Sequence, residues 1–208
     1  MKYLEKLLYN IKARNKNAEI LLKEGFRKAI HLVAALVPFI ADYHFYAAVL
    51  FLAVITALYT VFELMRLKGI NVFLVSCITS FAARQRDSGK FVLGPVTLAL
   101  GVILTLLLFS RTAAFIGILA LAFGDGLSGL IGKAFGKIHL FHLKDKTVAG
   151  SVTCFAAIFI SSSFFTVNPL KSLIIAACGT VAELLPLKDF DNILIPLVCA
   201  GTAVLLQV

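Results

Sequence analysis

Long apolar runs, separated by short charged segments, constrain this chain more than any other feature. The 208 residues are 60% hydrophobic and only 15% charged, and the mean hydropathy is +0.96. A water-soluble domain has a smaller apolar share, because much of its surface must be polar. The sequence therefore predicts an all-α, polytopic integral membrane protein that forms a single domain over residues 1–208.

The apolar runs predict about seven membrane-spanning helices, with the N-terminus in the cytoplasm. The first ends near Asp42, and the others cover residues 45–62, 91–109, 112–131, 148–166, 169–187 and 192–208. This topology places eighteen of the twenty Lys and Arg residues on the cytoplasmic side, as the positive-inside rule requires, and leaves Arg111 and Lys171 outside.

Two further segments are expected at the membrane surface. Residues 70–83 are apolar but too short to span a bilayer, and counting them as a span would reduce the cytoplasmic share of Lys and Arg to twelve of twenty. They are therefore predicted to be interfacial or re-entrant. Residues 1–27 carry an apolar stripe among basic residues, which predicts an amphipathic helix on an anionic leaflet, with an ordinary solvated helix as the alternative.

Asp125 is an acid inside an apolar helix. A carboxylate at membrane depth costs roughly 2.5–3.5 kcal/mol on insertion scales, and such a cost is usually tolerated for function. A metal-linked role is favoured over a helix-end carboxylate that pairs with a nearby Lys or Arg. Small residues recur every four positions on the same helix, at Gly124, Ser128, Gly132 and Gly136, which predicts close packing of another helix. The small residues Gly126 and Gly129 are predicted to open a groove for a lipid tail.

A second candidate site follows at the start of the next predicted helix. Cations, hydroxyl groups and small residues occur together there, at Lys144, Lys146, Thr147, Gly150 and Ser151. A helix N-terminus offers free N–H groups and a favourable dipole to a phosphate. The alternative is a solvated basic turn in which Thr147 is the N-cap.

A third candidate site lies before the last predicted span. Glu183 precedes a loop that ends at Asp191 and Asn192. Glu183 or Asp191 could share a metal with Asp125, whereas an ordinary helix connection with turn residues is an equal alternative.

The predicted topology brings these groups to one cytoplasmic face, together with Glu24, Arg27, Lys28, Lys133 and Lys137. Basic groups hold phosphate, and carboxylates hold hard cations such as Mg²⁺. A nucleotide bound with Mg²⁺ is the obvious ligand for such a basin. Positive-inside bias alone would explain the basic residues, but it does not explain the acids that accompany them.

Four motifs together resemble the polytopic membrane family that includes dolichol kinase, phytol kinase and CTP-dependent diacylglycerol kinase. They are Glu24-x-x-Arg27-Lys28-x-x-His31, Glu63-x-x-Arg66, the Gly124-Asp125-Gly126 helix with Phe135-Gly136-Lys137 and Lys146-Thr147-x-x-Gly150-Ser151, and Glu183 with Asp191-Asn192-x-x-x-Pro196. The central motif also resembles CDP-diacylglycerol synthase. The P-G-H-G-G run of that enzyme does not follow Lys188-Asp189 here.

The resemblance implies a kinase that transfers the γ-phosphoryl of CTP, or of another nucleotide, to a polyprenol, a phytol-like alcohol or diacylglycerol. It implies Mg²⁺ as cofactor, held by Asp125 and Asp191. Lys146 and Thr147 would bind phosphate, Glu183 and Asn192 would support them, and Asp125, Lys146 and Glu183 form the expected catalytic group. Glu24, Arg27 and Lys28 would complete the nucleotide or headgroup site.

The expected partners are a membrane lipid and a nucleoside triphosphate, with no nucleic acid, in a cell inner (cytoplasmic) membrane with the active site facing the cytoplasm. Homo-oligomerisation through the small residues is left open. The alternatives are a phosphatidate cytidylyltransferase and a non-catalytic transporter or scaffold. The CTP preference rests on the resemblance alone.

Overall fold

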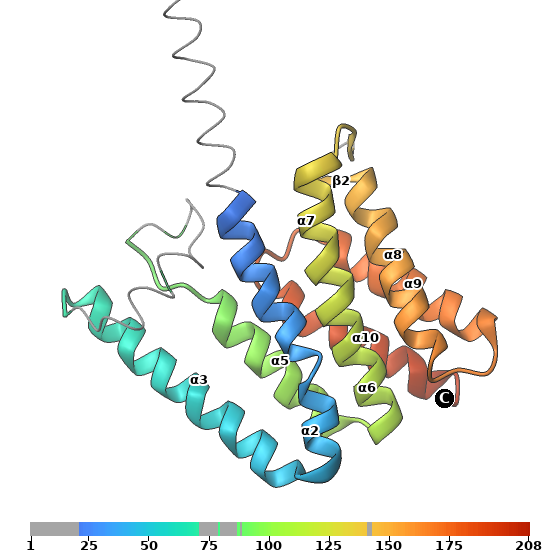
Figure 1. Ribbon diagram of the computed structural model, residues 1–208, viewed down its shortest axis with the longest axis horizontal. Coiled ribbons are helices and arrows are strands. Elements are labelled where there is room, and N and C mark those ends of the chain that lie inside the picture. Colours follow the sequence, from blue (N-terminus) through green and yellow to red (C-terminus); the bar gives the residue numbers. More distant parts are fainter. Residues whose placement is uncertain (1–20, 71–78, 80–86, 88, 141–142) are drawn as a thin grey trace, which may run out of the picture.

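The computed structural model describes residues 21–70, 79, 87, 89–140 and 143–208. Helices form most of this part of the chain, so the predicted all-α class is confirmed (Figure 1). One antiparallel hairpin interrupts them, where β1 (His139–Leu140) pairs with β2 (Leu143–Thr147). The interfacial segments predicted at residues 1–27 and 70–83 lie largely outside the described residues.

The helices follow the apolar runs closely. Residues 21–34 are helical, and the later helices are α2 (Val37–Tyr43), α3 (Phe45–Leu67), α5 (Gly94–Leu108), α6 (Arg111–Leu119), η2 (Ala120–Asp125), α7 (Gly126–Phe135), α8 (Val148–Ser163), α9 (Pro169–Leu184) and α10 (Asp191–Leu205).

Local sequence signals explain where several helices begin. Pro38, Pro95 and Pro169 each occupy the first turn of their helix, where the missing N–H of proline costs nothing and its fixed φ favours the helix. Asn168 caps α9, because its side-chain oxygen accepts a 2.9 Å hydrogen bond from the Leu170 N–H.

The run Arg111–Phe135 forms one continuous helix through the middle of the bundle, made of α6, the π-helical turn η2 and α7. It packs against α8, α9 and α10, and Ile118, Ala120 and Leu121 on it are fully buried. Close packing of these apolar side chains holds the helices of the bundle together. Asp125, the last residue of η2, is thereby fixed within the core.

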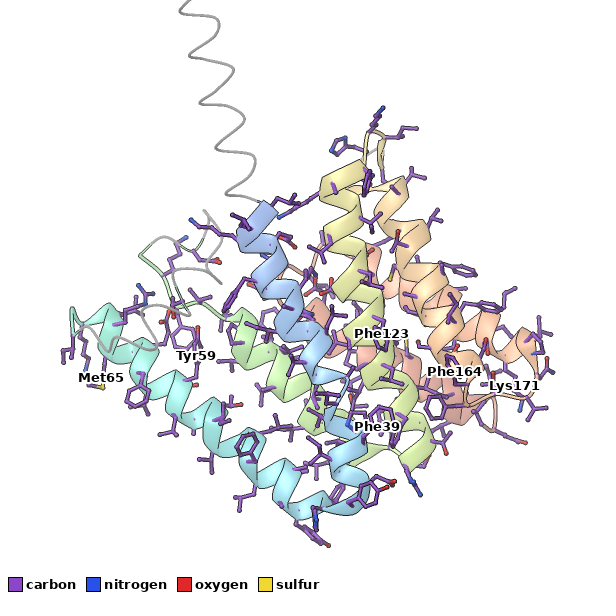
Figure 2. The ribbon with its side chains drawn as sticks, in the orientation of Figure 1. Phe39, Tyr59, Met65, Phe123, Phe164 and Lys171 are labelled. Carbon is purple, nitrogen blue, oxygen red and sulfur yellow. The ribbon has the colours of Figure 1, made fainter. Side chains whose placement is uncertain are left out.

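Helix α3 lies at the edge of the bundle, where it packs against α2 and α5 (Figure 1). Most of its apolar side chains project away from the other helices (Figure 2). Among the described residues, two helices are long and apolar enough to cross a membrane, Phe45–Leu67 and Arg111–Phe135.

The predicted seven spans are not confirmed. The apolar helices α5, α8 and α10 contain 15, 16 and 15 residues. At a rise of 1.5 Å per residue they are about 23 Å long, which is shorter than the roughly 30 Å hydrocarbon core of a bilayer. The helices therefore lie where the sequence predicts them, but several are too short to span alone in a straight, upright geometry.

Candidate functional site

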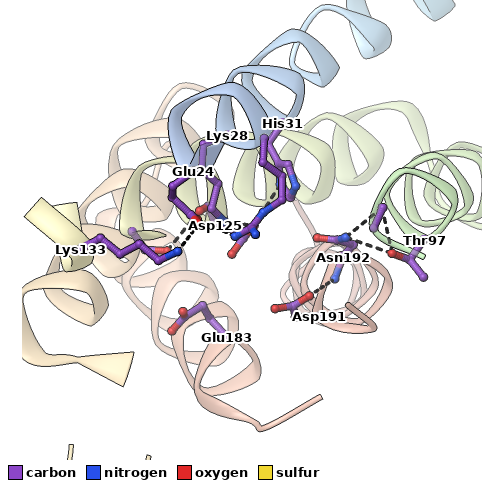
Figure 3. Close-up of polar contacts among 12 residues, drawn as sticks. Glu24, Lys28, His31, Thr97, Asp125, Lys133, Glu183, Asp191 and Asn192 are labelled. Carbon is purple, nitrogen blue, oxygen red and sulfur yellow. Dashed lines mark hydrogen bonds and ion pairs between the residues drawn. The ribbon is translucent and has the colours of Figure 1, made fainter. Parts of the chain in front are cut away.

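Buried charged and polar groups gather where helical residues 21–34 meet η2, α9 and α10 (Figure 3). The side chains of Glu24, Lys28, Asp125 and Glu183 are all less than a tenth exposed. Burying a charge is expensive unless it is paired. Each of these groups has a partner of opposite charge, and most of the pairs join segments that are distant in the sequence.

Asp125 is paired with Lys28 across the bundle. The Lys28 Nζ donates a 2.6 Å hydrogen bond to the Asp125 Oδ2. His31 Nδ1 lies 3.0 Å from the same oxygen but is not aligned for a hydrogen bond. Asp125 ends the π-helical turn η2, and single π-turns inside α-helices are frequent at functional sites. One carboxylate oxygen therefore faces two basic side chains from one helix.

Glu24 is held by cations from two helices. Arg27 Nη2 donates a 2.5 Å hydrogen bond to it, and Lys133 of α7 donates to its other oxygen. Burial raises the pKa of Glu24, but Arg27, Lys28 and Lys133 outweigh this effect and lower the pKa below its usual value. The carboxylate is therefore ionised at neutral pH and fixes the orientation of Arg27.

Glu183 of α9 accepts a hydrogen bond from Lys146 of β2 through Oε1. Its other oxygen, Oε2, is buried and has no hydrogen-bond partner. A buried, unbonded carboxylate oxygen is unusual, since leaving it unsatisfied costs free energy. The catalytic roles predicted for Lys146 and Glu183 remain predictions, but the two side chains do lie together.

Asn192 ties the start of α10 to the start of α5. Its Nδ2 donates to Thr97 Oγ1 at 3.0 Å and to the Gly94 carbonyl at 3.3 Å. Its backbone N–H donates to the Asp191 Oδ1 at 2.9 Å. Asn192 therefore supports the site through α5, and the metal role of Asp191 remains a prediction.

Thr147 is buried at the junction of β2 and α8. Its Oγ1 accepts a 3.2 Å hydrogen bond from the Gly150 N–H, which makes it the N-cap of α8. A Cβ at Gly132 of α7 would come within 2.9 Å of Thr147 Oγ1. The Ser151 hydroxyl donates to the Thr147 carbonyl at 3.3 Å. Thr147 therefore is the N-cap of α8, as in the alternative interpretation of this turn. Phosphate binding by the turn remains a prediction.

We expect Thr147→Val to destabilise the protein by about 1 kcal/mol, because the Gly150 N–H loses its acceptor. Thr147→Ser should keep the cap and remain within about 0.5 kcal/mol of the wild type. Thermal unfolding of the two purified variants in one detergent makes the comparison. Equal stability of the Val and Ser variants would contradict the capping role.

The glycines of α7 allow helical residues 21–34 to pack closely against it. A Cβ at Gly129 would clash with Lys28 Cε and approach Glu24 Oε1 to 3.0 Å. A Cβ at Gly126 would approach Leu32 Cδ2 to 3.3 Å. The glycines therefore allow helical residues 21–34 to bring Lys28 to Asp125. The lipid groove predicted over Gly126 and Gly129 remains a prediction.

A pocket opens beside Asp125. Helical residues 21–34 supply Arg27, Lys28 and His31 to its wall, and α10 supplies Asn192. The other cations predicted to bind phosphate do not line it. Lys133 and Lys146 are paired with acids, Lys137 is exposed between α7 and β1, and the Lys144 side chain lies outside the described residues.

Sequence reasoning missed part of the pocket wall. Gly94 and Pro95 in the first turn of α5 line it, as do Asp87 and Asp189. The Gly-Pro pair signals a helix start, but it carries no side chain that indicates ligand binding. His31 follows Lys28 by three residues, so the two side chains share one helix face. This spacing is the sequence signal that predicts His31 beside Lys28 in the pocket.

The donor set fits a metal ion that arrives with a phosphate ligand. The described residues contain no group of three or more His, Cys, Asp or Glu side chains that could hold an ion by themselves. Mg²⁺ is usually bound by one or two carboxylates together with substrate phosphates and water. Asp125, a carboxylate at the pocket wall, is suited to that kind of site.

No family model and no solved structure matches the chain. Over 157 residues it is 27% identical to a protein of Triticum aestivum named probable phytol kinase, chloroplastic, with 66% of this chain and 52% of the relative covered. The corresponding protein of Zea mays is 26% identical with the same coverage. The matched region therefore spans about half the length of these curated relatives.

An uncharacterized protein of Methanocaldococcus jannaschii matches more of the chain. It is 27% identical over 186 residues, which cover 86% of this chain and 92% of the relative. The chain thus has distant similarity to proteins named phytol kinase, and a relative of similar length whose function is not described by its name.

Proposed function

We propose that this protein is a membrane lipid-alcohol kinase that uses CTP, at the cytoplasmic face of the membrane. The buried pair of Asp125 and Lys28, at the wall of a pocket lined by both cations and carboxylates, is the observation that carries the proposal. The distant similarity to phytol kinases supplies the class of acceptor, a lipid alcohol. The resemblance of the motifs supplies CTP as the expected donor.

The pocket suits the phosphates of a nucleotide. Arg27 offers a planar fork of N–H donors that matches phosphate geometry, and Lys28 offers a compact positive charge. Glu24 holds Arg27 in place through its 2.5 Å hydrogen bond. A polyanion entering the pocket would therefore meet cations that are already oriented.

The pairing of Lys28 with Asp125 implies an exchange of partners when a phosphate binds. Lys28 Nζ donates its hydrogen bond to the Asp125 Oδ2. A phosphate would give Lys28 an alternative partner and would free the carboxylate for chemistry. Binding of the nucleotide and exposure of Asp125 are thereby coupled in the proposal.

The transfer is a displacement at the γ-phosphorus. The lipid hydroxyl oxygen forms a bond to this phosphorus while the bond to the β-phosphate bridging oxygen breaks, and the nucleoside diphosphate leaves. The hydroxyl proton must pass to a base, and Asp125 is the candidate if it is not a metal ligand. Mg²⁺, when bound, would neutralise charge on the transferring phosphoryl group.

The lipid acceptor requires a catalyst at the membrane boundary. Its hydroxyl stays near the interface while the nucleotide stays in water, so a kinase must hold both in line. Asp125 lies on Arg111–Phe135, which is one of two helices in the described part of the chain with the length and apolarity of a membrane span. In the proposal this helix brings the carboxylate to the lipid.

The test uses purified protein, Mg²⁺ and CTP labelled at either the α or the γ phosphate. Phytol, a polyprenol, diacylglycerol and phosphatidate are offered in turn. We expect the γ label on an alcohol and no α label on any lipid. Transfer of the α label to phosphatidate would replace the kinase with a cytidylyltransferase. If neither label moves, and labelled ATP also gives no lipid product, the kinase proposal is wrong.

A further inference from the structure

Glu63 of α3 is a fully buried acid that does not line the pocket. Arg66, one turn further along, donates to both of its oxygens, through Nε and Nη2 at 2.7 Å each. Each oxygen also accepts a second hydrogen bond. The Val92 N–H donates to Oε1 at 3.0 Å, and the Thr79 hydroxyl donates to Oε2 at 3.1 Å. The carboxylate therefore binds a backbone N–H and a hydroxyl group in addition to Arg66.

The residues around Val92 are attached to α3 at several points. The Val92 carbonyl accepts a 3.1 Å hydrogen bond from the Tyr59 hydroxyl, so both backbone groups of Val92 bond to α3. Arg66 Nη2 donates to the Lys90 carbonyl at 2.9 Å. The rings of Tyr59 and Phe91 meet edge to face with centroids 6.4 Å apart. Glu63 and Arg66 thus fix the three residues Lys90 to Val92.

This segment leads directly into the pocket wall. Val92 itself, and Gly94 and Pro95 in the first turn of α5, line the pocket beside Asp125. Asn192 of α10 holds the same turn through the Gly94 carbonyl and Thr97. The residue Val92, just before α5, is therefore hydrogen-bonded to α3, and the first turn of α5 is hydrogen-bonded to α10.

We propose that Glu63 is a positioning residue for the pocket, which acts by anchoring Val92 and so holding the first turn of α5 in place. The proposal rests on the proposed function, in which this pocket binds the nucleotide. Glu63 touches no substrate. In Glu63→Gln one of the two oxygens becomes an NH₂ group, so the donors of Arg66, Thr79 and Val92 are left with a single neutral acceptor oxygen. The bond to the Val92 N–H weakens, and the pocket wall loses its fixed position.

Loss of this anchor should affect binding of the nucleotide more than binding of the lipid or the rate of transfer. We expect Glu63→Gln to raise the KM for the nucleotide about tenfold, which corresponds to the loss of one or two buried hydrogen bonds. The kcat at saturating nucleotide and the KM for the lipid alcohol should change less than threefold. A residue that only stabilised the fold would lower thermal stability without this separation.

A charge-exchanged variant distinguishes the anchor from the ion pair. Glu63→Arg combined with Arg66→Glu keeps two opposite charges one turn apart, but it moves the carboxylate away from the Val92 N–H. We expect it to raise the nucleotide KM at least as much as Glu63→Gln. Asp42→Asn is the matched control, because Asp42 pairs with Arg111 in an ion pair that is largely exposed, and it should leave KM unchanged.

The experiment compares these variants by nucleotide KM and by hydrogen–deuterium exchange of the peptide covering residues 90–98. Faster exchange in both Glu63 variants, with a raised nucleotide KM, would support the proposal. Wild-type KM in the charge-exchanged variant, or unchanged exchange in Glu63→Gln, would overturn it. If the wild type phosphorylates no lipid, the proposed function fails, and the exchange data still decide whether Glu63 anchors the wall.

Discussion

Asp125→Asn is expected to lower the rate of lipid phosphorylation by about 10²–10⁴-fold, the usual effect of removing a catalytic acid–base group. An amide cannot accept the hydroxyl proton, and it binds a divalent cation poorly. The change also leaves Lys28 with its charge buried, because the Lys28 side chain is only 4% exposed. Loss of one partner of a buried pair costs roughly 3–5 kcal/mol. Both the transfer rate and thermal unfolding should be measured.

A double variant separates the two effects. Asp125→Asn with Lys28→Met removes both buried charges, so its stability should return most of the way to that of the wild type. Its activity should stay at the level of the single variant or lower. Asp42→Asn, which removes an acid at an exposed ion pair, should change neither quantity appreciably. Folded Asp125→Asn protein with the wild-type transfer rate would remove Asp125 from the mechanism.

The sequence was sufficient to find Asp125 and its basic neighbours but not to pair them. A carboxylate in an apolar helix is anomalous by itself, and the three- and four-residue spacing of Glu24, Arg27, Lys28 and His31 places them on one helix face. Which cation meets which acid depends on how the helices cross. Lys28 reaches Asp125, whereas Lys133 reaches Glu24, and no local pattern distinguishes these outcomes.

The helices were predicted well because apolar length and proline position are local signals. The point at which each helix ends depends less on local sequence. The apolar run 148–166 gives a helix that ends at Ser163, and the run 91–109 gives a helix that starts only at Gly94. The missing ends form connections, so counting apolar residues overestimates the distance that each helix can span.

The pocket wall at α5 could not be predicted, because its contribution is a backbone position rather than a chemical group. Gly94 and Pro95 carry no charge or hydrogen-bonding side chain. Their place beside Asp125 follows from contacts made elsewhere, by Glu63 to Val92 and by Asn192 to Gly94. Sequence patterns identify reactive side chains more readily than the neighbours that position them.

Helices α5 and α10 approach each other closely at Gly101, so a larger side chain there is expected to destabilise the protein. A Cβ at this position would overlap the backbone carbonyl oxygen of Asn192, and it would lie 3.0 Å from the carbonyl carbon and 3.2 Å from Ile193 Cα. Pro196, inside α10, has no N–H to donate to the Asn192 carbonyl in the usual i to i−4 bond. The Asn192 carbonyl therefore lacks its usual helical donor, and it lies against the surface that Gly101 leaves open.

Gly101→Ala is accordingly expected to destabilise the protein by about 1–3 kcal/mol or more, since only backbone atoms stand in the way and α10 must move as a unit. That shift would also draw Asn192 away from Thr97 and weaken the pocket wall. Gly25→Ala is the matched control, because a Cβ at Gly25 meets nothing within 4 Å. Helix propensity should make the control more stable by roughly 0.5–1 kcal/mol. Thermal unfolding in one detergent compares them, and a Gly101→Ala protein as stable as Gly25→Ala would show that the helices do not meet at this glycine.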